Sequence, residues 1–218
     1  YGNYAGDTEA DSTKRHYPGE LVWSPDSKRF ATMKWDMRKL DDLWVINSVG
    51  GKRPELETYK YQMPGEPGPK GYLYMFTMND SRTEASFKQI KSQAFKDQEV
   101  SLQNARRTAK DNYLDFWKNE WLGDNSGFYL VRQSRDLKRL DLCWVGVDSD
   151  STKTIISERE RTYVEYRTPF LIGGGKQILH WSERNGWANI YLYNNDGAFV
   201  RNLTDGAFHV EDILGVNE

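Results

Sequence analysis

The chain has 218 residues, a formal net charge of -2 and a hydrophobic content of 38%. This balanced charge gives no reason to expect a nucleic-acid surface or a polybasic membrane tether. The single cysteine, Cys143, excludes an internal disulfide and a Cys-x-x-Cys site, and its apolar neighbours predict a buried thiol. No stretch reaches the roughly 18 apolar residues of a transmembrane helix, so no membrane span is expected.

Aromatic residues are unusually frequent, at 14% of the chain, with 8 Trp, 13 Tyr and 9 Phe. Large rings fit the half-buried surface of a pleated sheet better than the surface of a helical bundle. We therefore predict an all-β fold. The chain starts without Met and ends where a new strand would begin, so we expect it to be a piece of a longer protein.

The first clear element is a hairpin at residues 22–33, which read Val-Trp-Ser-Pro-Asp-Ser-Lys-Arg-Phe-Ala-Thr-Met. Pro25 sets the backbone for a turn, and Asp26 and Ser27 can bond back to the main chain. Residues 166–181 repeat the same order of strand, turn, basic residue and strand with different residues. The expected strands of a first blade are 20–24, 30–36, 43–46 and 58–63.

Prolines and glycines make residues 63–69 a loop that leads to the next blade. The following run, 71–78, is apolar on both faces, as in a strand stacked between neighbours. The segment 83–111 is ambiguous, because the spacing of Phe87, Ile90 and Lys91 hints at a helix, whereas the resemblance of other segments to a known family implies mainly strands and loops.

Two further strand quartets follow, and Asn195-Asp196-Gly197 predicts a type I′ hairpin in the second of them. The expected strands are 115–121, 127–134, 139–147 and 154–158, then 167–172, 177–183, 189–193 and 200–203. The pattern predicts about four four-stranded antiparallel blades of a larger β-propeller. Their approximate bounds are 20–63, 69–112, 113–160 and 163–206, with the start of a further blade at 207–218.

The hairpin at 22–33 resembles the repeat of TolB-type and dipeptidyl peptidase IV-type propellers. Residues 181–193, which read Trp-Ser-Glu-Arg-Asn-Gly-Trp-Ala-Asn-Ile-Tyr-Leu-Tyr, and the Leu-Thr-Asp-Gly at 203–206 sharpen the resemblance. Together with 59–76, they are similar to the N-terminal propeller of the bacterial dipeptidyl peptidase IV / prolyl oligopeptidase family. The resemblance covers most of the chain and implies that 1–218 is part of a seven- or eight-bladed domain.

The resemblance implies a periplasmic or secreted serine exopeptidase that removes dipeptides or tripeptides, often after proline. In that family a separate α/β-hydrolase domain performs the chemistry. The chain has no Gly-x-Ser-x-Gly, and His16, His180 and His209 lack an evident serine and acid around them. We therefore expect no catalytic residues, no cofactor and no metal in this chain, and we read His180 as a structural residue in a strand.

Two residues are candidates for substrate contact by resemblance. Family members carry an aromatic residue and an arginine ahead of a proline, which match Tyr166 and Arg167 before Pro169. The alternative is an arginine in an ordinary ion pair at a strand edge. The family's adjacent acidic pair for the substrate's amino terminus is not found in residues 4–11.

Other motifs have structural explanations. The glycines before Lys176 lack the spacing of a phosphate loop and predict a hairpin turn. The acidic pairs at 41–42 and 148–150 do not continue as calcium loops, so we expect solvated turns. Asn79 and Asn202 begin formal glycosylation sequons, which matter only in a eukaryotic secretory setting.

The preferred function is a non-catalytic propeller region that gates substrate access in such a peptidase. Its expected partners are the catalytic domain and peptide substrates, and self-association into a homo-oligomer is left open. The alternative is a TolB-like propeller that binds a protein partner. A third function class is a carbohydrate-binding module. Its only support is the high aromatic content, which core packing already explains.

Overall fold

A computed structural model describes residues 21–102, 121–122, 124–214 and 216. These residues form three four-stranded antiparallel sheets and one two-stranded hairpin. The first sheet contains β1 (Leu21–Trp23), β2 (Arg29–Asp36), β5 (Lys70–Met78) and β6 (Ala85–Ile90). The second contains β7 (Gln98–Leu102), β8 (Gly127–Ser134), β9 (Arg139–Gly146) and β10 (Lys153–Arg159). The third contains β11 (Phe170–Ile172), β12 (Gln177–Ser182), β13 (Asn189–Asn194) and β14 (Phe199–Asn202).

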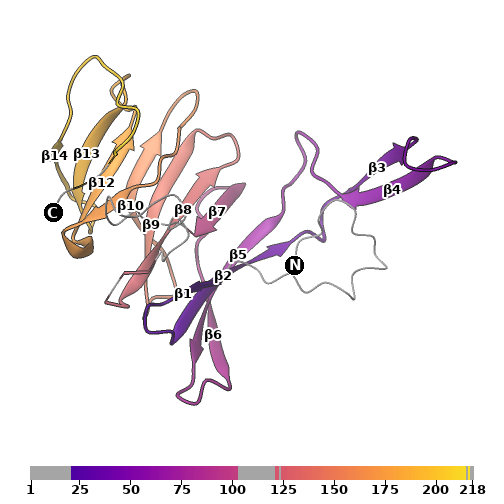
Figure 1. The fold of residues 1–218 in the computed structure, drawn as a ribbon, viewed down its shortest axis with the longest axis horizontal. Helices are drawn as coiled ribbons and strands as arrows, with labels where there is room; N and C mark the ends of the chain where they lie inside the picture. Colours follow the sequence, from indigo (N-terminus) through magenta and orange to yellow (C-terminus); the bar gives the residue numbers. More distant parts are fainter. Residues whose placement is uncertain (1–20, 103–120, 123, 215, 217–218) are drawn as a thin grey trace.

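The three sheets stand side by side in chain order, as Figure 1 shows. One core lies between the first and second sheets, and another lies between the second and third. In β8, Phe128 and Leu130 enter the first core, while Tyr129 and Val131 enter the second. The predicted all-β fold and partial propeller are confirmed. Among the described residues, no helix has the length and hydropathy needed to cross a membrane.

The strands of the expected first blade are present, but their predicted grouping is wrong. β3 (Asp42–Asn47) and β4 (Glu55–Lys60) pair only with each other and form a hairpin that we call the arm. β2 instead pairs with β5, from Arg29 opposite Thr77 to Asp36 opposite Lys70. The reason is burial, because β5 supplies two fully buried side chains to the core whereas the arm exposes its large apolar ones. The described chain thus has three four-stranded blades.

The second sheet also begins with a different strand from the one expected. Its first strand is β7, and residues 115–120 lie outside the described part of the chain. Trp121 is described and forms an isolated bridge with Phe128. In the ambiguous segment, 85–90 and 98–102 are strands, so the helical interpretation is wrong there.

One aromatic row crosses all four strands of the first sheet. Trp23, Phe30, Phe76 and Phe87 are successive register partners on β1, β2, β5 and β6. Their ring centroids are 4.7, 4.7 and 5.5 Å apart along the row. Such cross-strand pairs add to sheet stability beyond the area they bury. The row lies on the face opposite the first core, and Phe87 is 66% exposed.

The Ser-Pro-Asp turn of the first sheet has a structural copy in the second. The Ser24 hydroxyl donates to Asp26 at 2.6 Å and accepts from the Arg29 amide at 2.9 Å. At 134–139, Ser134 donates to Asp136 at 2.5 Å and accepts from the backbone amide five residues later at 3.0 Å. In both turns the serine hydrogen bond is the largest factor that holds the aspartate pKa below its ordinary value.

Glycines with positive φ lie in the turns of the third sheet. Gly173, Gly174 and Gly175 all have positive φ and join β11 to β12, so the predicted hairpin turn is confirmed. In the turn at 195–197, only Gly197 has positive φ. A type I′ turn needs positive φ at both central residues, so that prediction is wrong. The observed register shift between Leu192 and Tyr193 accompanies this turn instead.

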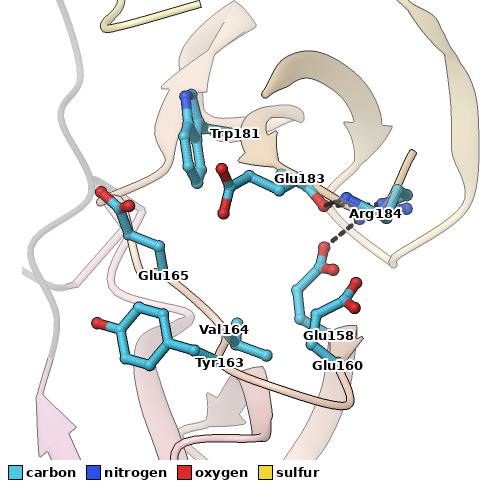
Figure 2. Close-up of a pocket in the computed structure, with 9 residues that line it drawn as sticks. Glu158, Glu160, Tyr163, Val164, Glu165, Trp181, Glu183 and Arg184 are labelled. Atoms are coloured by element: carbon cyan, nitrogen blue, oxygen red, sulfur yellow. Dashed lines mark hydrogen bonds and ion pairs between the residues drawn. The ribbon is translucent and has the colours of Figure 1, made fainter. Parts of the chain in front are cut away.

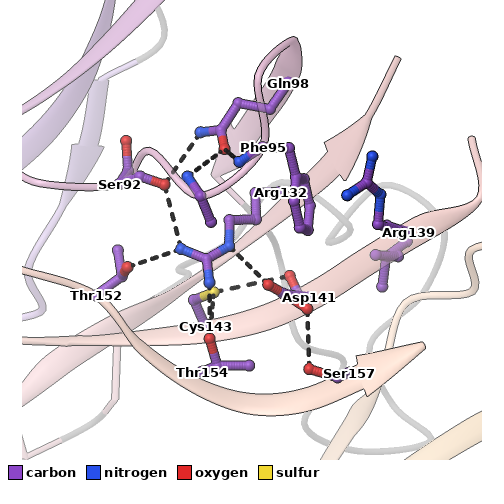
Figure 3. A network of polar contacts seen from close by, with 12 residues as sticks. Ser92, Phe95, Gln98, Arg132, Arg139, Asp141, Cys143, Thr152, Thr154 and Ser157 are labelled. Carbon is purple, nitrogen blue, oxygen red and sulfur yellow. Dashed lines mark hydrogen bonds and ion pairs between the residues drawn. The ribbon is translucent and has the colours of Figure 1, made fainter. Parts of the chain in front are cut away.

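A buried polar network ties the segment before β7 to the second sheet (Figure 3). The Asp141 carboxylate accepts from Arg132 Nε at 2.8 Å and from Arg159 Nη2 at 2.6 Å. Burial raises the pKa of Asp141, but these two hydrogen bonds and one from Ser157 outweigh it and leave the pKa below its ordinary value. Phe95 packs under the guanidinium groups of Arg132 and Arg159, 5.7 and 5.3 Å from its ring centroid.

Cys143 lies beside this network and is fully buried, as predicted. Burial raises the pKa of its thiol to about 11, so the thiol stays protonated at neutral pH. The residue is a core side chain of the second sheet.

The strands of each sheet run alternately up and down, which fixes where the connections lie. The turn between the second and third strands of a sheet falls at the same end as the segment that leaves for the next sheet. The Glu160 amide accordingly donates to the Lys138 carbonyl at 3.0 Å, and the Val164 amide donates to the Leu137 carbonyl at 2.8 Å. We call this the connection end; it is formed by residues 61–69, 91–97, 135–138, 160–169 and 183–188.

Leu130→Ala should destabilise the fold by about 2 to 5 kcal/mol, because Leu130 is fully buried between two sheets and its removal leaves a cavity. Urea unfolding followed by tryptophan fluorescence measures the change. Leu214→Ala is the matched control, since Leu214 is 95% exposed and should change stability by less than about 0.5 kcal/mol. Equal losses in the two variants would contradict the packing described.

Asp141→Asn should cost about 3 kcal/mol or more at pH 7, because it leaves two arginines facing a neutral side chain in a buried site. The folded-state pKa of Asp141 is depressed, so its stabilisation is complete above the ordinary value of 3.8 and is lost as the pH falls through the folded value. The difference between wild type and variant should therefore shrink on acidification below pH 3.8. Urea midpoints from pH 7 to pH 2.5 test this, with Asp80→Asn on an exposed turn as the control.

Candidate functional site

Tyr166 and Arg167 both lie on the connection between β10 and β11, at the connection end. Tyr166 is half-buried and packs against the core between the second and third sheets. Burial raises the pKa of its phenol, and a hydrogen bond with Thr168 only partly opposes this effect. Tyr166 is therefore a neutral wall residue, whereas the Arg167 side chain remains 37% exposed.

Arg167 is fixed on one edge and on one face. Its Nε donates to Glu165 Oε1 at 2.8 Å, and its Nη2 lies 2.7 Å from the same oxygen. Its Cζ atom stands 5.1 Å from the ring centroid of Trp181. Within the described residues, Nη1 has no hydrogen-bond partner, so one edge of the guanidinium stays available to a ligand. The ion pair that was the alternative to substrate contact is thus present, and among the described residues it leaves Nη1 without a partner.

Trp181 connects this arginine to the C-terminal segment. The indole is 5% exposed, and its Nε1 donates to the Val210 carbonyl at 2.6 Å. The His209 ring packs against the indole at 5.8 Å with an interplanar angle of 72°. His209 Nδ1 also lies 3.9 Å from Glu183 Oε1. The described residues of 207–218 form no strand, and Val210 packs against the third sheet.

A shallow pocket lies beside this cluster (Figure 2). Its lining is acidic and aromatic: Glu158, Glu160, Tyr163, Val164, Glu165, Trp181, Ser182, Glu183 and Arg184. On its floor, Glu158 accepts from Arg184 and lies 2.8 Å from Nε2 of His180. Burial raises the pKa of Glu158, but the hydrogen bond and charge of His180 and the charge of Arg184 together keep it below its ordinary value.

His180 is buried in β12, with 3% exposure, and among the described residues the acidic group that it contacts is Glu158. Its Nδ1 has no hydrogen-bond partner among the described residues. The contact of its Nε2 is with a carboxylate and not with a serine hydroxyl, so the observed environment agrees with the structural role inferred from the sequence. His16 and the acidic stretch at 4–11 lie outside the described residues.

A second, wider hollow opens at the connection end between the first and second sheets. It has a volume of about 1050 Å³ and is lined by residues that include Trp35, Tyr72 and Arg135. Arg135 donates to the carbonyls of Glu66 and Met63, which anchors the loop at 61–69. Within the described ranges, no three His, Cys, Asp or Glu side chains are grouped as metal ligands would be.

The resemblance made Arg167 a candidate substrate contact, and this stays a prediction; the sequence did not point to the groups that contact Arg167 in the structure. Glu165 lies two residues before Arg167, and in an extended segment residues i and i+2 share a side, so the pair was available from spacing. Trp181 lies on β12, beyond β11 and its turn, and all four strands of the third sheet separate His209 from Arg167, so no local signal links them.

Many solved structures resemble this chain, including the following two. The dipeptidyl peptidase 4 of Porphyromonas gingivalis superposes with a TM-score of 0.71 at 21% identity, over 90% of this chain and 26% of that one. A putative dipeptidyl aminopeptidase IV from Bacteroides ovatus gives 0.65 at 18% identity, over 91% of this chain and 28% of that one. This chain thus spans about a quarter of each.

A family model described as the dipeptidyl peptidase IV (DPP IV) N-terminal region matches residues 19–218. The match includes all three described sheets, the arm, and the Tyr166 and Arg167 pair. The chain therefore belongs to the family of dipeptidyl peptidase IV N-terminal regions.

Proposed function

We propose that this chain is the non-catalytic, substrate-gating propeller region of a serine exopeptidase of the dipeptidyl peptidase IV type. The parent protein removes dipeptides or tripeptides from short peptides, proline-containing ones included, in the periplasm or outside the cell. Its α/β-hydrolase domain supplies the nucleophile, since this chain contains no Gly-x-Ser-x-Gly. Family membership supports the proposal, as does the similarity to a dipeptidyl peptidase 4 and to a putative dipeptidyl aminopeptidase IV.

The observation that carries the proposal is the state of Arg167. Its guanidinium is partly exposed, oriented by two neighbours and left with an unused Nη1 among the described residues. A guanidinium in this state donates charge-assisted hydrogen bonds to a carbonyl or carboxylate oxygen. Peptides carry such oxygens at every residue, so Arg167 is the substrate contact that we propose, with Tyr166 as the apolar wall beside it.

Two filled cores between side-by-side blades support the proposed gating role, because such packing makes a rigid wall. In this proposal the wall borders the path of the substrate, admits a short extended chain and excludes a folded protein. The contact with Arg167 then orients the peptides that enter.

The arm favours a second role in protein contact. Trp44, Ile46 and Leu56 share one face of this two-stranded hairpin and are 70%, 68% and 65% exposed. Figure 1 shows the arm projecting away from the three sheets. A hairpin of two strands gains little stability alone, and an exposed apolar face favours association. We assign this face to contact with a second copy of the protein, and a TolB-like contact with a different protein is the alternative.

In the full-length enzyme, Arg167→Ala should lower kcat/KM for a chromogenic Ala-Pro dipeptide substrate by about ten- to a hundredfold, because a charged hydrogen bond is lost. The melting temperature should change little, since the side chain is not part of a core. Arg201→Ala is the control, because Arg201 is exposed on β14. A lower melting temperature with unchanged kcat/KM would mean that Arg167 is only structural.

Replacing Ile46 and Leu56 by Ser should shift the full-length protein from dimer towards monomer in sedimentation velocity, because the change removes the apolar face of the arm. Val45→Ser is the matched control, since Val45 lies on the other face of β3. A monomeric wild-type protein that captures a different protein through this face would support the TolB-like alternative.

A further inference from the structure

We infer that Glu165 and Trp181 are positioning residues, which hold the Arg167 guanidinium so that its Nη1 faces a bound peptide. The inference rests on the proposed role of Arg167 and adds to it the two groups that make the arginine usable. Neither group has to touch the substrate. Both act through contacts that the structure describes.

Glu165 fixes the rotation of the guanidinium in its own plane. Both Nε and Nη2 approach the same carboxylate oxygen, at 2.8 and 2.7 Å. A planar fork held at two nitrogens by one oxygen can no longer turn, and its third nitrogen must point away from the carboxylate. Because both residues lie on the same connection, two positions apart, the pair needs no distant element to form it.

Trp181 fixes the tilt of the same plane. The guanidinium carbon lies 5.1 Å from the indole centroid, within the range of a cation–π contact. The indole is itself immobile, because it is 5% exposed and donates to the Val210 carbonyl. The contact with Glu165 restricts the in-plane rotation of the guanidinium, and the contact with Trp181 restricts the tilt of its plane.

The Arg167 side chain has then already lost its conformational entropy before a peptide binds. A preorganised donor binds more tightly than the same donor on a mobile side chain, because less conformational entropy is lost on binding. Glu165 also keeps the pair close to neutral overall, so the free Nη1 acts as a directed donor more than as a diffuse positive charge. Loss of Glu165 should therefore weaken substrate binding without changing the chemical step.

The test is a double-mutant cycle in the full-length enzyme, with the same Ala-Pro dipeptide substrate. Glu165→Gln keeps the size of the side chain and removes its charge, and it should raise KM about two- to fivefold with kcat unchanged. In the Arg167→Ala background the same substitution should have no further effect, because the residue through which it acts is gone. Trp181→Phe, which keeps a smaller ring, should also raise KM when Arg167 is present and should have no effect on KM in the Arg167→Ala background.

Glu183→Gln is the matched control, since Glu183 lines the same pocket with similar exposure but lies against His209. It should leave KM unchanged in both backgrounds. An unchanged KM in Glu165→Gln, or an equal rise with and without Arg167, would overturn the positioning role while the substrate contact of Arg167 stands. If Arg167→Ala itself leaves kcat/KM unchanged, the proposed function of Arg167 fails and the positioning role falls with it.

Discussion

The second sheet is buried on both faces, and the rest of the structure depends on this constraint. Along β8, alternate side chains enter two different cores, so the sheet has no solvent-facing side. Trp121 adds a hydrogen bond from its indole to the Val22 carbonyl of the first sheet, 3.0 Å long and fully buried. A sheet of this kind cannot be stable alone, because both of its faces are apolar and each needs a neighbouring sheet to cover it.

Stacking also determines where polar groups can be placed. Since both faces of a middle sheet are apolar, charged side chains that bind ligands are confined to the ends of the strands and to the connections. Arg167, Glu165 and the acidic pocket all lie there. Where a charged group does enter the sheet, as Asp141 does, two arginines and a serine surround it and it serves the packing. The division between structural charges and the charges of the proposed site follows from burial.

Much of this arrangement could be predicted from the sequence, and the failures have identifiable causes. The apolar runs at 127–134 and 139–147 became β8 and β9 because a run buried on both faces is unambiguous. The strand at 98–102 lay in a segment that was left ambiguous, since only Val100 and Leu102 of its residues are buried and its pairing with β8 is a tertiary contact that the sequence does not show. The wrong grouping of the first blade came from assuming that strands near in sequence pair with each other, which holds less often across a long insertion.

The site shows the same limit. Resemblance pointed to Arg167, and spacing would have supplied Glu165, but Trp181 meets them only through tertiary packing.

The arm illustrates a further consequence of sheet pairing. Asp36 and Lys70, which flank residues 37–69, are direct register partners, so this long segment leaves and re-enters the blade at one point. The four strands of the blade pair without this segment. Residues 37–69 could therefore be replaced by segments of other lengths or by other binding loops with little loss of stability in the propeller.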